Sequence, residues 1–224
     1  MTLGRCTTWA SCGPPWDGYH RRMPKGHVDS QALPNDGLTT KQRRLLPVTA
    51  VFTGDGKGKS TAAFGMAMRA YNQHFSIGVF QFVKSPKWKV GEEAVFRTLA
   101  GLDGAPVVEW HKMGQGWSWI KKRKDGEDPA EAAAEGWEEV KRRLQAEQQD
   151  FYLLDEFTYP IEWGWIDIDD VCETLRHRPG TQHVVMTGRR AHPKLVEVAD
   201  LVTEMRKIKH PMDQGRKGQK GIEW

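Results

Sequence analysis

The segment TGDGKGKS at residues 53–60 constrains the fold of this chain more than any other stretch. It follows an apolar, β-branched run at 48–52 and leads into a series of good helix formers at 60–73. A glycine-rich loop between a strand and a helix is the setting of a phosphate-binding loop, in which backbone N–H groups and the helix N-terminus face phosphate oxygens. The segment therefore predicts an α/β domain that binds a nucleotide.

Individual residues of this loop have predicted roles. Lys59 bridges phosphates as a point charge, and Ser60 or Thr61 offers a hydroxyl to Mg²⁺. Thr53 stands where the usual pattern has its first glycine, so a surface turn rich in glycine and lysine is the alternative. The predicted nucleotide-binding residues of the loop are Gly54, Asp55, Gly56, Lys57, Gly58, Lys59, Ser60 and Thr61.

A second signal is the run LLDE at 153–156, an apolar strand that ends in two carboxylates. Acidic residues end many strands, but together with a phosphate loop they resemble the element that completes a magnesium–nucleotide site. Asp155, Glu156 and Ser60 are the predicted metal-binding residues, and Glu156 and Lys59 the predicted catalytic ones. These motifs predict nucleotide binding, and a P-loop ATPase or kinase of another class fits them equally well.

The remaining pattern alternates apolar strands with helices. Asp128 before Pro129 is typical of a helix start. This alternation predicts a P-loop NTPase-like (RecA-like) α/β fold, a mostly parallel sheet with helices on both faces. The further expected strands are 76–84, 106–113, 151–157, 183–187 and 201–210, and the further expected helices are 128–149, 167–177 and 193–199.

The first 46 residues differ in composition from the rest. They are rich in Gly, Pro and polar residues, and they predict a flexible N-terminal arm, with a short helix around 41–46, ahead of a catalytic domain at 47–224. Met23 is an alternative start of the protein. The beginning of the chain is a poor signal peptide, and no run approaches the ~20 apolar residues of a membrane helix, so we expect a cytoplasmic protein without a membrane partner.

Charge and cysteine content exclude few functions. The net charge is +4 and the basic runs are scattered, which favours a solvated surface, while polyanion binding is the sharper alternative. No recognised nucleic-acid-binding motif is present, so we expect no nucleic-acid partner. Three widely spaced cysteines argue against a disulfide framework.

Residues 47–224 resemble the P-loop type corrinoid adenosyltransferases, which act on cob(I)alamin or cob(I)yrinic acid a,c-diamide in bacterial cobalamin biosynthesis. The resemblance extends over nearly the whole domain and keeps one order along the chain. The matching segments are TGDGKGKSTAAFG (53–65), Arg69, QFVK (81–84), GEE (91–93), GQGWSW (114–119), LLDEFTY (153–159), TGR (187–189) and MRKIKHPMDQGRKGQKGIEW (205–224).

The resemblance implies a particular reaction. A corrinoid reduced to Co(I) attacks the 5′ carbon of ATP, and triphosphate leaves from the phosphate loop. Lys57 and Lys59, with Mg²⁺ or alternatively Mn²⁺, are suited to stabilise that polyanion. In the family Arg69 matches an arginine near the nucleotide, with an exposed helix charge as the alternative. Trp117 and Trp119 match two aromatic residues that pack on the corrin, with hydrophobic core as the alternative.

The resemblance also implies partners. A homodimer is expected, in which the segment before the phosphate loop, residues 36–46 here, covers the partner's active site. A reduced flavoprotein is the expected electron donor. The preferred corrinoid stays open at this point.

Overall fold

The computed structural model describes residues 36–84, 89–113 and 128–223. The chain divides into two units, residues 1–43 and 44–224. Within its described residues the first unit has one short helix, α1 (Thr40–Arg43). This helix lies where the sequence predicts one, although it begins one residue earlier and ends three residues sooner. The predicted flexible arm lies largely outside the described residues.

The second unit is built on a six-stranded sheet in the order β3-β2-β4-β5-β1-β6, and all neighbouring strands are parallel. The predicted α/β fold is therefore confirmed. β2 and β4 are buried along their whole length, as expected for central strands of a parallel sheet. The strands are β1 (Thr49–Thr53), β2 (Ile77–Gln81), β3 (Val108–Lys112), β4 (Phe151–Asp155), β5 (His183–Thr187) and β6 (Leu201–Glu204).

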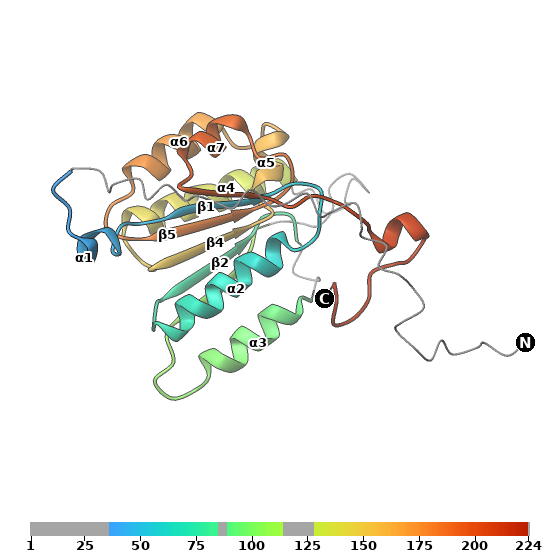
Figure 1. The fold of residues 1–224 in the computed structure, drawn as a ribbon, viewed down its shortest axis with the longest axis horizontal. Helices are drawn as coiled ribbons and strands as arrows, with labels where there is room; N and C mark the ends of the chain where they lie inside the picture. The colour runs from blue at the N-terminus through green and yellow to red at the C-terminus, as the bar shows by residue number, and fades with distance from the viewer. Residues whose placement is uncertain (1–35, 85–88, 114–127, 224) are drawn as a thin grey trace, which may run out of the picture. The chain divides into compact units, whose positions relative to one another are not determined.

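Helices cover both faces of this sheet (Figure 1), with α2 and α3 on one face and α4 to α7 on the other. Asp128 caps α4 as predicted, because its carboxylate accepts a hydrogen bond of 2.9 Å from the Ala130 N–H. The helices of this unit are α2 (Lys59–Asn72), α3 (Gly91–Ala100), α4 (Pro129–Gln145), α5 (Thr158–Glu162), α6 (Ile168–His177), α7 (Pro193–Val198) and the 3₁₀ helix η1 (Pro211–Gln214).

Several boundaries differ from the sequence prediction. The strand expected at 76–84 ends at Gln81, and the last hydrogen bonds to its neighbours run from the Met113 N–H to the Gln81 carbonyl and from the Phe82 N–H to the Asp155 carbonyl. The strand expected at 201–210 ends at Glu204, where the chain turns against the phosphate loop. Helices α3 and α5 were not predicted. Both are short, and α3 buries only Phe96, so neither has a long apolar stripe to detect.

The helices on the α4 side are held by one continuous apolar cluster, and Leu144 near the end of α4 is 1% exposed within it. We expect Leu144→Ala to lower the free energy of unfolding by about 2–5 kcal/mol, since it removes buried methyl groups and leaves a cavity. Leu102→Ala is the matched control, because Leu102 is 58% exposed and should change stability by less than about 0.5 kcal/mol. If both variants lose the same free energy of unfolding in urea, the buried packing of Leu144 is contradicted.

Candidate active site

Polar side chains meet at the carboxyl edge of the sheet, where open α/β folds bind ligands. Gln81 is the last residue of β2, Asp155 of β4 and Thr187 of β5. Ser60, the second residue of α2, reaches the same place from the phosphate loop that follows β1. The fold therefore brings residues from distant parts of the sequence to one point.

Asp155 is the centre of this cluster and is fully buried. Its Oδ1 accepts hydrogen bonds from the Ser60 hydroxyl at 2.7 Å and the Thr187 hydroxyl at 2.9 Å. Its Oδ2 accepts from Gln81 Nε2 at 2.9 Å and from Lys84 Nζ at 2.8 Å. Four donors, from α2, β2, β5 and the segment after β2, thus satisfy one carboxylate, as a buried charge requires.

Lys84 provides the charge that keeps Asp155 ionised. Burial alone would raise the pKa of Asp155, but the Lys84 ammonium and the hydrogen bonds from Lys84 and Ser60 hold that pKa below its ordinary value. Burial would likewise lower the pKa of Lys84, and the charge of Asp155 raises it instead. Both shifts indicate a buried ion pair, whose loss on one side would leave an uncompensated charge.

Glu156, the next residue, has a raised pKa, unlike Asp155. Burial and the negative charge of Asp155 raise the pKa of Glu156 to about 7. Its φ of 61° is left-handed, an uncommon backbone conformation for a residue with a side chain, and its N–H donates to the Thr187 hydroxyl at 2.9 Å. Among the described residues its Oε2 is buried without a hydrogen-bond partner. Glu156 is thus the carboxylate at this edge with an oxygen available to a ligand.

The phosphate loop places its lysine beside these carboxylates. Lys59 Nζ donates to the carbonyls of Gly54 at 2.7 Å and Gly56 at 2.6 Å, so the side chain lies across its own loop. Burial and the positive charge of Arg189 lower the pKa of Lys59. Arg189 itself lies 4.0 Å from the Asp55 carboxylate. A polyanion bound among these cations would relieve their mutual repulsion.

A contact of the Thr53 side chain accounts for the threonine that replaces the first glycine of the usual phosphate-loop pattern. It is the last residue of β1, and its hydroxyl accepts a hydrogen bond of 3.1 Å from the Ala191 N–H. A glycine here could not make this contact, which fixes the segment after β5 beside the loop. The loop keeps glycine where its backbone is left-handed, at Gly54 (φ 93°) and Gly58 (φ 106°).

The residues at this edge fit a magnesium ion, although the described residues contain no cluster of three or more His, Cys, Asp or Glu side chains arranged around one. Mg²⁺ takes oxygen ligands and is bound in nucleotide sites by one or two protein oxygens together with phosphates and water. Ser60 offers a hydroxyl next to Asp155, and Glu156 has an oxygen without a partner.

Arg69 is not brought to the phosphate loop. It lies ten residues beyond Lys59 on α2, about 15 Å along the helix axis. There it lines a hollow of about 270 Å³ with Phe75, Phe151 and His183, near the amino ends of β4 and β5. Trp117 and Trp119 lie outside the described residues.

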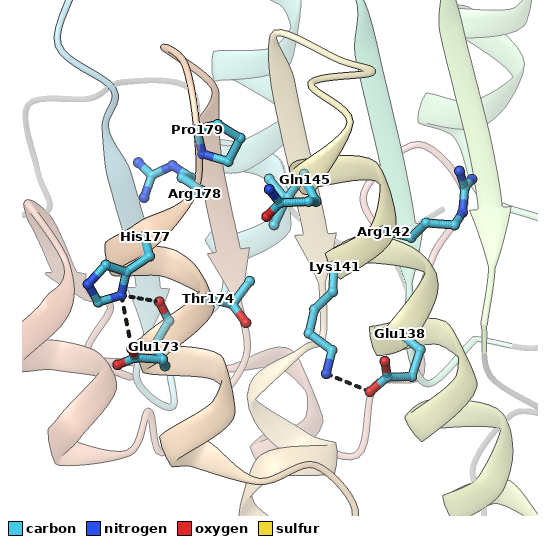
Figure 2. A pocket seen from close by; sticks show the side chains of 10 residues that line it. Glu138, Lys141, Arg142, Gln145, Glu173, Thr174, His177, Arg178 and Pro179 are labelled. Atoms are coloured by element: carbon cyan, nitrogen blue, oxygen red, sulfur yellow. Dashed lines mark hydrogen bonds and ion pairs between the residues drawn. The ribbon is translucent and has the colours of Figure 1, made fainter.

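A hollow of about 420 Å³ lies between the carboxyl-terminal halves of α4 and α6 (Figure 2). Several of its side chains are paired across short helical spacings, namely Lys141 with Glu138, Arg142 with Glu139 and the His177 ring with Glu173. The hollow lies at the end of the sheet away from the phosphate loop, since both helices run back toward the amino ends of the strands that follow them. It is therefore separate from the site at the carboxyl edge.

Sequence reasoning assigned no role to three residues that hold Asp155, namely Gln81, Lys84 and Thr187, although they lie in the matching segments 81–84 and 187–189. Each lies at or just beyond the carboxyl end of a strand next to β4. That position, combined with a parallel sheet, is the signal that would have identified them.

None of the described helices is both long enough and apolar enough to span a lipid bilayer.

Comparison with known proteins places this site in a family. Residues 46–224 match the sequence model of the family described as ATP:corrinoid adenosyltransferase BtuR/CobO/CobP. Proteins named corrinoid adenosyltransferase are similar over most of their length. The one from Escherichia coli K12 is 39% identical, with 79% of this chain and 85% of that protein covered. The one from Pseudomonas aeruginosa is 39% identical, with coverages of 79% and 83%, and the one from a Sinorhizobium species is 38% identical, with 78% of each.

The Asp155–Lys84 pair yields a prediction about stability. Lys84→Met should lower the free energy of unfolding at pH 7 by about 3–5 kcal/mol, because it leaves the buried carboxylate without its cation. The pKa of Asp155 then rises above that of the unfolded chain, so the variant should lose stability as pH rises above about 4. Lys194→Met, which removes an exposed lysine paired with Asp169, is the control and should change little. If Lys84→Met and Lys194→Met change the free energy of unfolding in urea equally across pH 4–8, the assignment of a buried Asp155–Lys84 ion pair is contradicted.

Glu156 yields a prediction of opposite sign. Its pKa of about 7 lies above the ordinary 4.5, so its contribution to stability is present below about pH 4.5 and lost as pH rises through 7. Glu156→Gln should therefore stabilise the fold at pH 8, by a margin that shrinks toward pH 4. Glu173→Gln, at an exposed position on α6, should show no such trend. A Glu156→Gln variant less stable than the wild type at pH 8 would refute the raised pKa.

Proposed function

This chain belongs to the ATP:corrinoid adenosyltransferase family, and from that premise we propose how its residues transfer the adenosyl group of ATP to a reduced corrinoid. The observation that carries the proposal is the convergence of Lys59, Ser60 and the two carboxylates at the carboxyl edge of β4. The phosphate loop and the family membership make ATP the co-substrate. The corrinoid, cob(I)alamin or cob(I)yrinic acid a,c-diamide, is the substrate.

The reaction is a displacement at carbon. An electron pair of Co(I) forms a bond to the 5′ carbon of ATP, the bond from that carbon to the phosphate oxygen breaks, and triphosphate leaves with the bonding pair. The cobalt is thereby oxidised to Co(III). Charge develops on the leaving oxygen, so the protein accelerates the step mainly by stabilising a departing polyanion.

The phosphate loop supplies that stabilisation. We assign Lys59 and Lys57 to the phosphate chain, together with the backbone N–H groups of the loop. To bind phosphate, Lys59 must exchange the carbonyls of Gly54 and Gly56 for phosphate oxygens, so that two hydrogen bonds to neutral acceptors are replaced by stronger ones to charged acceptors. Asp55 and Thr61 are exposed at the mouth of the loop, and we keep both among the nucleotide-binding residues.

The acidic residues have separate tasks in this proposal. Asp155 already accepts four hydrogen bonds, so we assign it the positioning of the Ser60 hydroxyl, which would bind the metal, while Asp155 itself would reach the metal through water. Glu156 has an unpartnered oxygen, and it is close enough to Lys59 and Arg189 for their charges to act on it, so we assign it to the metal and the ribose. Mg²⁺, with Mn²⁺ as an alternative, supplies charge neutralisation of the phosphates.

The remaining assignments rest on the family alone. We propose that Trp117 and Trp119 pack against the corrin, and that Arg69 binds the nucleotide. A cytoplasmic homodimer, in which residues 36–46 cover the partner's active site, and a reduced flavoprotein as electron donor complete the proposal.

The proposed reaction predicts distinct products. Under anaerobic conditions with ATP, Mg²⁺ and chemically reduced cob(I)alamin, the protein should form a light-sensitive adenosylated corrinoid and one triphosphate for each product molecule. Lys59→Ala should lower kcat/KM by at least about 10²-fold, since it removes a charge that stabilises the leaving group. Lys194→Ala, on the exposed face of α7, should retain activity.

Two results would contradict this account. Orthophosphate and ADP without any corrinoid product would favour a P-loop ATPase or kinase of another class. Full turnover by Lys59→Ala would refute the assignment of the phosphate loop.

A further inference from the structure

The carboxyl-terminal segment, residues 205–223 and called here the tail, is unusually basic. Residues 205–224 hold six Lys and Arg residues against Asp213 and Glu223, an excess of four that equals the net charge of the whole chain. The 204 residues before them therefore have equal numbers of basic (Lys and Arg) and acidic (Asp and Glu) residues. Such a concentrated positive charge attracts polyanions when it lies near their binding site.

The tail begins in contact with the phosphate loop. The Met205 N–H donates to the Thr53 carbonyl at 2.8 Å, and the Met205 carbonyl accepts from the Gly56 N–H at 2.6 Å. A Cβ on Gly54 would lie 2.5 Å from the Met205 carbonyl oxygen, and a Cβ on Gly56 would lie 2.7 Å from that of Arg206. The two backbones are therefore so close that the loop tolerates only glycine here.

The tail also ends at the phosphate loop. After η1 the chain turns back (Figure 1), and the Glu223 carboxylate forms an ion pair with Lys57. The Glu223 N–H donates to the Gln219 carbonyl at 2.8 Å, and only 19% of the Glu223 side chain is exposed. The tail is thus fixed at both ends to the loop that holds Lys59, with its basic residues in between.

We propose that the tail is a second half of the polyphosphate site, in which Glu223 acts as an internal counter-anion that the phosphate chain displaces from Lys57. The proposal rests on the assignment of Lys57 to phosphate in the proposed function. Arg206 follows the contact with Gly56, is exposed, and has no hydrogen bond or ion pair to any other described residue. We assign Arg206 as a further positioning cation for the phosphates.

The energetics favour such an exchange. The Lys57 side chain is 46% exposed, and ion pairs at this exposure contribute little to stability, so a multiply charged phosphate chain competes effectively for the same ammonium. The carboxylate in turn competes with the phosphates for Lys57 after the reaction. Glu223 should therefore weaken the binding of triphosphate and favour its release.

The test measures the affinity of the full-length protein for sodium tripolyphosphate by titration calorimetry at fixed ionic strength. Glu223→Gln should bind tripolyphosphate about two- to fivefold more tightly than the wild type, and Arg206→Gln about two- to fivefold more weakly with a smaller dependence on salt. In a Lys57→Gln background, the gain from Glu223→Gln should disappear, because the pair has already been removed.

Asp213→Asn is the matched control. It removes one carboxylate from the same tail, but Asp213 pairs with Lys207, not with the phosphate loop, so its gain should be clearly smaller. Three results would overturn this inference and leave the proposed function intact. They are unchanged or weaker tripolyphosphate binding by Glu223→Gln, a gain in affinity that persists in the Lys57→Gln background, and an equal gain in Asp213→Asn. A wild-type protein that binds no tripolyphosphate would overturn the phosphate-loop assignment as well.

Discussion

The buried carboxylate of Asp155 organises the carboxyl edge of the sheet. It receives hydrogen bonds from β2, β5, the start of α2 and the segment after β2, so one charge fixes the relative positions of four elements. This arrangement is stable only because Lys84 compensates the charge. Its consequence for function is indirect, because Asp155 holds Ser60 in place and raises the pKa of Glu156, the carboxylate with an oxygen available to a ligand.

Around this centre, the positive charges are concentrated on the phosphate-loop side of the two carboxylates at the end of β4, although Lys84 pairs with Asp155 and Glu223 with Lys57. The carboxylates lie at the ends of the strands, whereas the cations Lys57, Lys59 and Arg189 lie along the phosphate loop and the segment after β5, with the basic tail beside them. A nucleotide whose ribose lies near the carboxylates and whose triphosphate lies among the cations matches this separation. For a reaction that expels triphosphate, we propose that this concentration of positive charge lowers the barrier by stabilising the leaving group.

The sequence alone predicted the parallel α/β fold and the phosphate loop, because these depend on local patterns: a glycine-rich turn, a capped helix and apolar strands. It also named Ser60 and Asp155 as parts of one metal site, because the two motifs occur together in magnesium–nucleotide sites. It did not predict the roles of Gln81, Lys84 and Thr187, since their contact with Asp155 follows from strand order, which no local pattern contains. The role of Arg69 near the nucleotide came from family resemblance and stays a prediction, since Arg69 lies about 15 Å along α2 from Lys59. The short helices α3 and α5 bury too few residues to leave a periodic signal.

The central claim is that the phosphate loop holds triphosphate as a leaving group while carbon is transferred to cobalt. A single turnover with ATP carrying ¹³C at the 5′ position, followed by ¹³C and ³¹P NMR, tests it most directly. The account predicts that the label appears on the cobalt-bound carbon of the corrinoid and that all three phosphorus atoms remain together in triphosphate. Label that stays in ADP, with phosphorus released as orthophosphate, would contradict the account.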